Sequence, residues 1–364
     1  APLTYYLANA LSLLIPRGIV FGVKATFVLG FLCAGLGAFA LVRRMADTRS
    51  GLVSAASYLF APYLHYIDPH ARGDLPEFFA LGMAPVALWA ITALSQSPQR
   101  RYFLLSTMLV AALIVSHNLM ALVFFSIILA YVLWLTLVSH KNPGANATRS
   151  WPLYVALALG LALAAFFWLP VGLERDAVQL GNLIGPGHFD YHNHFLSFGE
   201  LLGPSIPIDL GAVNPAFRFN LGIAQWVLAA IGVFVYATQR AARGLANLAA
   251  VRATEPMPSF GFWMLSGTAL LLLMLPLSAP LWDAIPLMAF WQFPWRLLGP
   301  AALCLAVLGG LSTHMLGQMP HKFQAYVLTV LFVSPVFLAL TLFIPPNWED
   351  FGPTDRLAML EFEL

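Results

Sequence analysis

The ionisable side chains of this chain are concentrated at a few points, and the densest group falls within residues 65–77: His65, Asp68, His70, Arg72, Asp74 and Glu77. Carboxylates can act as a general base or hold a divalent cation, and an arginine can pair with a phosphate. Asp74 and Glu77 are therefore catalytic candidates, and Arg72 is a substrate-binding candidate. Asp74 and Glu77 also have the spacing of a helix capping box, with Pro76 in the first turn. The two roles are compatible, and the sequence leaves both open.

A second polar stretch, residues 188–194, carries four potential metal ligands. If this stretch is extended, alternate side chains point to one face and offer a ligand set for zinc or another divalent ion: His188, Asp190, His192 and His194. Their spacing matches no strong zinc signature. We therefore favour a solvated or interfacial polar loop.

Two further side chains stand at the edges of apolar stretches. His117, within Ser116-His117-Asn118, could hydrogen-bond a phosphate or a sugar, or it could cap the turn, which we slightly favour. Arg296 ends the stretch Phe290-Trp-Gln-Phe-Pro-Trp-Arg296. An aromatic belt with a snorkelling cation is one interpretation. We favour a binding role for Arg296 toward a lipid-linked phosphate, because Pro294 and four aromatic residues suggest a shaped groove.

The elements that must position these residues are apolar helices. Hydrophobic residues make up 60% of the 364 positions and charged residues only 9%. The apolar residues form about ten stretches long enough to cross a bilayer as helices, namely 18–42, 50–66, 78–95, 102–117, 119–139, 151–174, 221–239, 261–279, 297–313 and 324–344. We expect an all-α polytopic membrane protein with an additional short outer-face helix before residue 17 and an outer-face loop region at 175–220.

The loops alternate in charge, which predicts their sides. The loops after the odd-numbered stretches hold 11 of the 18 Lys and Arg residues, whereas 14 of the 16 acids lie at or beyond the opposite ends. The positive-inside rule then places the basic loops in the cytoplasm and the acidic loops outside. Because the basic residues are explained by topology, the net charge of +2 does not indicate nucleic acid as a partner. Nucleotide-binding glycine loops and a Ser/His/Asp nucleophile motif are absent.

The ends of the chain suggest a longer protein. Residues 1–16 are too short to span, yet the predicted topology puts them outside, so we expect that a preceding span and outer loop are missing from this sequence. Residues 1–345 then form one transmembrane domain, and residues 346–364 form an outer polar segment that begins a truncated C-terminal region.

Four motifs together resemble a family of large bacterial membrane proteins named 6-pyruvoyl-tetrahydropterin synthase-related: Tyr58-Leu-Phe-Ala-Pro-Tyr-Leu64, Arg72-Gly-Asp-Leu-Pro-Glu-Phe-Phe-Ala80, Ser116-His-Asn-Leu-Met120 and Phe293-Pro-Trp-Arg-Leu297. Pterin chemistry is not implied. Those proteins are similar to the GT-C glycosyltransferases, which take a sugar from a polyprenyl phosphate on the outer face of the bacterial cytoplasmic membrane. The resemblance implies a GT-C-like fold, with its main catalytic acid in an outer loop that would precede residue 1. Carried over by motif are Arg72, Asp74, Glu77, His117 and Arg296.

The sequence thus predicts a membrane glycosyltransferase that uses a polyprenyl-phosphate-linked sugar, with a divalent cation left open as cofactor. The alternative is a non-catalytic structural subunit that packs against other membrane proteins. A transporter of lipid-linked sugar is less favoured, because no inverted repeat is evident and few ionisable groups lie at mid-span.

Overall fold

The computed structural model describes residues 2–15, 18–141, 150–174, 187–209, 216–246, 258–316 and 321–343, together with Ala177 and Ala212. Within this part the chain is helical or irregular and has no β-strand. The predicted segment 346–364 and part of the 175–220 region lie outside the described residues.

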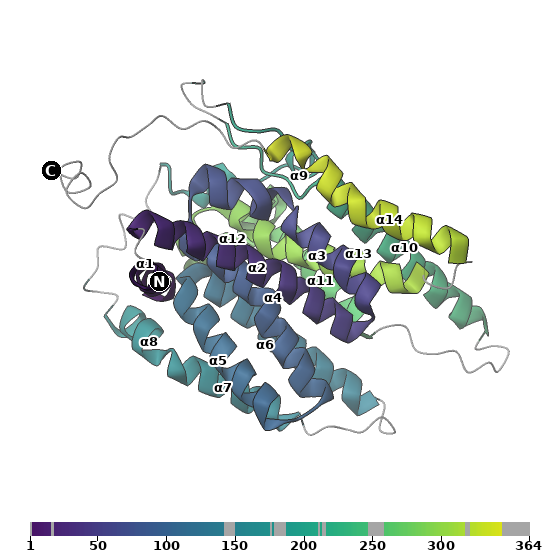
Figure 1. Cartoon of the computed structure of the whole chain (residues 1–364), viewed down its shortest axis with the longest axis horizontal. Coiled ribbons are helices and arrows are strands. Elements are labelled where there is room, and N and C mark those ends of the chain that lie inside the picture. The colour runs from purple at the N-terminus through teal and green to yellow at the C-terminus, as the bar shows by residue number, and fades with distance from the viewer. Residues whose placement is uncertain are drawn as a thin grey trace.

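The α-helices, shown in Figure 1, are α1 (Pro2–Leu14), α2 (Ile19–Met45), α3 (Thr48–Leu59), α4 (Leu75–Gln96), α5 (Arg100–Ser116), α6 (Asn118–Lys141), α7 (Trp151–Leu163), α8 (Ala165–Leu173), α9 (Phe198–Leu201), α10 (Ile223–Ala246), α11 (Pro258–Leu273), α12 (Ala279–Ala284), α13 (Leu298–Leu316) and α14 (His321–Leu338). A π-helix, η1 (Tyr63–Arg72), precedes α4. The 3-10 helices are η4 (Tyr191–His194), η6 (Pro276–Ser278), η7 (Pro286–Trp291), η8 (Pro294–Leu297) and η9 (Leu340–Leu342).

Within the part of the chain that the structure describes, five segments are long and apolar enough to cross a membrane: Ile19–Met45, Leu75–Gln96, Asn118–Leu137, Pro294–Leu316 and Ala325–Leu342. Two bent pairs raise the number to seven if each is one span, namely α7 with α8, bent by 68°, and α11 with the η6–α12 segment, bent by 87°. The expectation of an all-helical protein is therefore confirmed for the described residues, with several helices that could span a membrane by their length and composition.

The predicted span 50–66 is wrong as a continuous helix. Helix α3 ends at Leu59, and η1 begins at Tyr63. Pro62 lies between them and has no backbone N–H, so it cannot donate the hydrogen bond that would continue α3. The chain instead turns here, with the Ala61 N–H donating to the Tyr58 carbonyl at 3.2 Å. This break is what carries residues 63–77 to the end of the bundle.

Helices α4 and α13 form the centre of the molecule, because 83% and 94% of their apolar windows are buried. Helix α4 packs against α2 and α5, and α13 packs against α3, α10 and α11. In Figure 1, α5, α7 and α8 lie on one flank, and α10 and α14 lie on the other. Small residues allow the close packing of α2 and α4, since a Cβ at Gly82 would lie 2.4 Å from the Gly30 carbonyl oxygen.

Loops predicted to share a side of the membrane share an end of the bundle. At one end, Arg44 in the last turn of α2 donates from Nε to the Gln96 side chain at the end of α4, at 2.8 Å. The Asp47 carboxylate at the start of α3 lies 2.6 Å from His314 near the end of α13. At the other end lie the start of α4, the α5–α6 turn and η8, and this end holds the candidate site.

Candidate functional site

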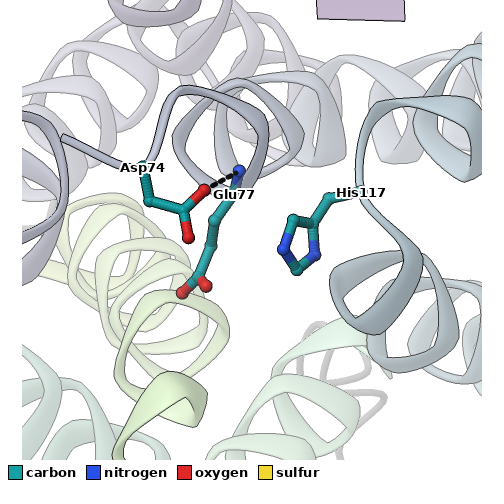
Figure 2. Close-up of side chains that lie close together, drawn as sticks. All are labelled: Asp74, Glu77 and His117. Carbon is teal, nitrogen blue, oxygen red and sulfur yellow. Dashed lines mark hydrogen bonds between the residues drawn. The ribbon is translucent and has the colours of Figure 1, made fainter. Parts of the chain in front are cut away.

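Local structure at the start of α4 fixes the first carboxylate. The π-helix η1 ends at Gly73, whose positive φ of 65° suits glycine, and Asp74 follows as the N-cap of α4. The Asp74 carboxylate accepts a hydrogen bond from the Glu77 N–H at 3.1 Å (Figure 2). The capping box is only half formed, because the Asp74 N–H donates to the Asp68 carbonyl at 3.2 Å. The Glu77 carboxylate is therefore free to make other contacts.

Glu77 is the centre of the cluster. It is fully buried, and its carboxylate accepts a hydrogen bond from the Tyr63 hydroxyl at 2.6 Å. Its Oε1 lies 3.1 Å from Arg72 Nη1, and its Oε2 lies 3.4 Å from Arg296 Nε. Because a buried carboxylate is stable only when paired, these contacts from η1 and η8 explain how it is accommodated inside the bundle.

The two guanidinium groups are not equally satisfied. Arg72 pairs with Asp68, with Asp74 at 3.0 Å and with Glu77, and it donates to the Tyr63 hydroxyl at 2.8 Å. Arg296 Nε is buried and makes no hydrogen bond within the described residues, although it lies near Glu77. Of the two arginines, Arg296 therefore has an N–H group that can still donate a hydrogen bond to a ligand.

Aromatic rings border both cations. The Arg72 guanidinium lies 4.9 Å from the centroid of the Trp295 ring, and that of Arg296 lies 5.2 Å from the Phe293 ring. Such contacts stabilise a cation that has lost part of its hydration. The predicted aromatic segment before Arg296 thus lines the site.

The cluster holds more negative than positive side chains. Asp68, Asp74 and Glu77 face two arginines, so one carboxylate lacks a matching cation. Asp68 is fully buried and its Oδ2 has no hydrogen-bond partner among the described residues. Burial, together with the nearby Glu77 carboxylate, raises the pKa of Asp68 well above its ordinary range. A proton on Asp68 would balance the charges and leave Asp74, with 23% of its side chain exposed, as the accessible carboxylate.

His117 joins the cluster from the turn between α5 and α6, and Figure 2 shows its ring beside Asp74 and Glu77. Its Nδ1 accepts a hydrogen bond from the Met120 N–H at 3.1 Å, which is the capping role favoured from the sequence. In a neutral ring the proton then lies on Nε2, which can donate to a ligand.

Asp74, Glu77 and His117 are also the group among the described residues that could hold a metal ion, since their ligand atoms lie within 4.8 Å of one another. A metal at Nε2 of His117 would have to replace the proton that the Met120 contact favours there. The geometry therefore suits a hydrogen-bond donor at His117 better than a metal ligand.

The 188–194 stretch is built differently from the predicted metal face. It is not extended: Asp190 caps the 3-10 helix η4, and its carboxylate lies 2.7 Å from His192 Nδ1. His192 Nε2 lies 3.1 Å from Asp283, and His194 Nε2 lies 2.6 Å from the His188 carbonyl oxygen. These side chains thus make separate contacts within the loops. Among the described residues, they do not come together as a set of metal ligands.

Tyr63 and Trp295 lie within motifs quoted from the sequence, but neither was chosen there as a candidate site residue. Tyr63 bridges Glu77 and Arg72, and Trp295 lies against Arg72. Tyr63 was hidden because its position depends on the π-helix, which no sequence pattern indicated. The ion pair between Asp68 and Arg72 could have been predicted from the sequence, because the two residues are four positions apart.

Comparison of the chain with protein-family models, curated proteins and solved structures finds no match.

Proposed function

We propose that this protein is a GT-C-like glycosyltransferase of the bacterial cytoplasmic membrane, with its apolar helices in the membrane and its acidic loops outside. It moves a sugar from a polyprenyl-phosphate donor to an acceptor on the outer face. The observation that carries this proposal is Arg296: its side chain is only 14% exposed, its Nε makes no hydrogen bond within the described residues, and it lies against the Phe293 ring just before the apolar helix α13. A lipid-linked phosphate needs that combination of a cation and an apolar wall.

In the proposed reaction, the bond between the anomeric carbon and the phosphate oxygen breaks, and the phosphate leaves with the electron pair. Arg296 stabilises the charge that develops on this leaving group, and Arg72 supports it from the other side of Glu77. The acceptor hydroxyl forms the new bond to the anomeric carbon, and its proton goes to a carboxylate. Asp74 suits this role, because it is the most exposed of the three acids.

The role of Glu77 is then to position both arginines. It contacts Arg72 and Arg296 at once, although they come from elements more than 200 residues apart in the chain. When a phosphate enters, it competes with Glu77 for Arg296 Nε, which is held only by a long contact. His117 can donate from Nε2 to the phosphate or to a sugar hydroxyl.

Transfer from a polyprenyl-phosphate sugar, measured with the protein in proteoliposomes, tests this proposal. We expect Arg296→Ala to lower the rate at least about 100-fold, the loss typical of removing one electrostatic contact to a transition state, while the protein stays folded. The matched control is Arg101→Ala, which removes an exposed arginine at the other end of the bundle. Transfer that is unchanged in Arg296→Ala contradicts the assignment.

The second candidate is a structural subunit. The observation in its favour is that Arg72 is saturated by three carboxylates and a tyrosine, as in a cluster that only holds elements together. In that case Arg296→Ala lowers thermal stability, and no polyprenyl-phosphate sugar is consumed by the wild-type protein. The same variant therefore separates the two candidates.

A further inference from the structure

A cavity of about 360 Å³ lies in the loop region after α8, outside the charged cluster. Its walls come from α9 and from residues 203–206 and 217–220, and they include Glu200, Ile206, Phe217, Arg218 and Phe219. The volume falls in the range of about 300–1,000 Å³ that is usual for small-molecule sites.

The walls of this cavity are held by hydrogen bonds to the helical bundle. The Ile208 N–H donates to the Tyr66 hydroxyl at 3.0 Å, and Trp226 Nε1 donates to the Leu201 carbonyl at 3.0 Å. The buried Asn220 side chain accepts from the Ser205 hydroxyl at 2.8 Å and from the Gly222 N–H at 3.0 Å. The cavity is therefore preformed, which lowers the entropic cost of binding.

The lining combines flat rings with two opposite charges. Phe217 and Phe219 stack with their centroids 5.7 Å apart and their planes at 6°, and Phe217 is 39% exposed. The Arg218 carbonyl accepts a hydrogen bond from Asn220 Nδ2 at 3.2 Å, whereas the Arg218 guanidinium has no hydrogen bond or ion pair with any described residue. Glu200 uses Oε2 in the capping box with Ser197, and its Oε1 accepts no hydrogen bond from any described residue.

These features fit a carbohydrate better than other ligand classes. An aromatic ring covers the C–H face of a pyranose, while a carboxylate and a guanidinium bind its hydroxyls in pairs. A simple anion is disfavoured, because Glu200 lines the same cavity as Arg218. A purely apolar ligand is disfavoured, because it would cover the Arg218 guanidinium without pairing it.

Trp295 lies between the cavity and the charged cluster, because it contacts both Phe219 and Arg72. Phe219 stacks on Trp295 with centroids 4.4 Å apart and planes at 13°, and Arg72 lies 4.9 Å from the same Trp295 ring. We propose that this cavity binds the sugar moiety of the acceptor and presents it beside the cluster. The acceptor role rests on the proposed transferase function, whereas sugar binding at this place does not.

Saturation-transfer NMR on the whole chain in lipid nanodiscs, free of glycoside detergents, tests the proposal. The probes are methyl β-D-glucopyranoside, methyl β-D-galactopyranoside, methyl α-D-mannopyranoside and cellobiose, each titrated into the millimolar range. We expect saturable binding of at least one probe, weakened at least tenfold in Phe217→Ala and in Arg218→Gln. The matched control is Phe198→Ala, which removes an equally large ring that is 62% exposed on α9 but does not line the cavity.

Each outcome has one meaning for the cavity. Absence of binding by all four probes overturns the proposal, as does binding that Phe217→Ala leaves unchanged or displacement of the sugar by millimolar inorganic phosphate. Arg296→Ala should keep sugar binding and lose transfer. Sugar binding without any transfer by the wild-type protein supports the sugar site and contradicts the proposed function. Transfer without sugar binding supports the proposed function and contradicts the sugar site.

Discussion

Arg72 and Arg296 both contact the Glu77 carboxylate, but they differ in how firmly the protein holds them. Arg72 is held by acids on η1 and α4 and by the Tyr63 hydroxyl, so its position is fixed before any ligand arrives. Among the described residues, the Arg296 guanidinium has the long contact to Glu77 and the contact with the Phe293 ring. A residue that must exchange a protein partner for a phosphate needs this weaker attachment, whereas the residue that shapes the site needs the stronger one.

Tyr63 provides a test of this arrangement at the level of one atom. Its hydroxyl is buried and both donates to Glu77 and accepts from Arg72. Tyr63→Phe keeps the ring and removes both hydrogen bonds. We therefore expect the free energy of unfolding to fall by about 1.5–3 kcal/mol, as for hydrogen bonds to charged groups. The measurement is thermal unfolding in nanodiscs.

Tyr5→Phe is the control for this variant, because Tyr5 is 61% exposed. We expect no change in its melting temperature. If Tyr63→Phe melts like the control, the hydroxyl does not bridge the two charged groups in the folded protein.

At the scale of elements, the sequence predicted the helices better than their breaks. The stretches 18–42 and 78–95 correspond to α2 and α4 within a few residues, because apolar composition alone determines where a membrane helix can run. The change from α3 to η1 was missed, although Pro62 could have indicated it. The π-helix η1 packs against α3, α4 and α13, and it contains Pro69, which cannot donate a backbone hydrogen bond to the preceding turn.

The 3-10 helix η4 is tied to α12 by His192, and this tie depends on pH. The hydrogen bond with Asp190 raises the pKa of His192 above its ordinary value, which is about 6.5. A raised folded-state pKa means that the tie contributes fully below about pH 6.5 and is lost as pH rises through the folded-state pKa. The hydrogen bond from His192 also lowers the pKa of Asp190, so the contribution of that acid is lost only in strong acid.

NMR titration of ¹³C-labelled histidine measures this effect. We expect His192 to titrate above about pH 6.5 and to move down toward that value in Asp190→Asn, with a smaller shift in Asp283→Asn. A His192 signal that titrates below its ordinary value in the wild-type protein would show that the loop contacts are absent in solution.

At the scale of the whole molecule, charge alternation along the sequence predicted which loops lie together. The 67–77 loop, the His117 turn and the segment before Arg296 were all assigned to one side, and their side chains meet at one end of the bundle. Asp47 and His314 meet near the other end. The pattern could not predict which side chains pair, because pairing depends on the helix packing and on the turn geometry at Gly73.

The number of spans was harder to predict than their composition. Among the described residues, five helices meet the requirements of length and apolarity, and two further segments are bent at Ala164 and after Leu273. An apolar stretch shows that a segment is hydrophobic but not whether its helix is straight. A bent pair of helices and a straight span therefore look alike in the sequence.

The orientation of the bundle can be tested by cysteine labelling. In a Cys33→Ala, Cys304→Ala background, Phe198→Cys lies in the predicted outer region and Gln99→Cys in a predicted cytoplasmic loop, and both positions are exposed. We expect a membrane-impermeant maleimide to label Phe198→Cys in intact spheroplasts and Gln99→Cys only after lysis. The reverse pattern would place the charged cluster on the cytoplasmic side and remove the basis for an outer-face donor.

The central claim is that the charged cluster receives a lipid-linked phosphate, and a structure in lipid nanodiscs with a polyprenyl-phosphate sugar tests it most directly. We predict phosphate density within hydrogen-bonding distance of Arg296 or Arg72, beside Asp74 and His117, with the contact between Arg296 and Glu77 opened. A cluster that keeps its present contacts, with Phe293 and Trp295 filling the space and no phosphate bound, would contradict the account and favour a structural subunit.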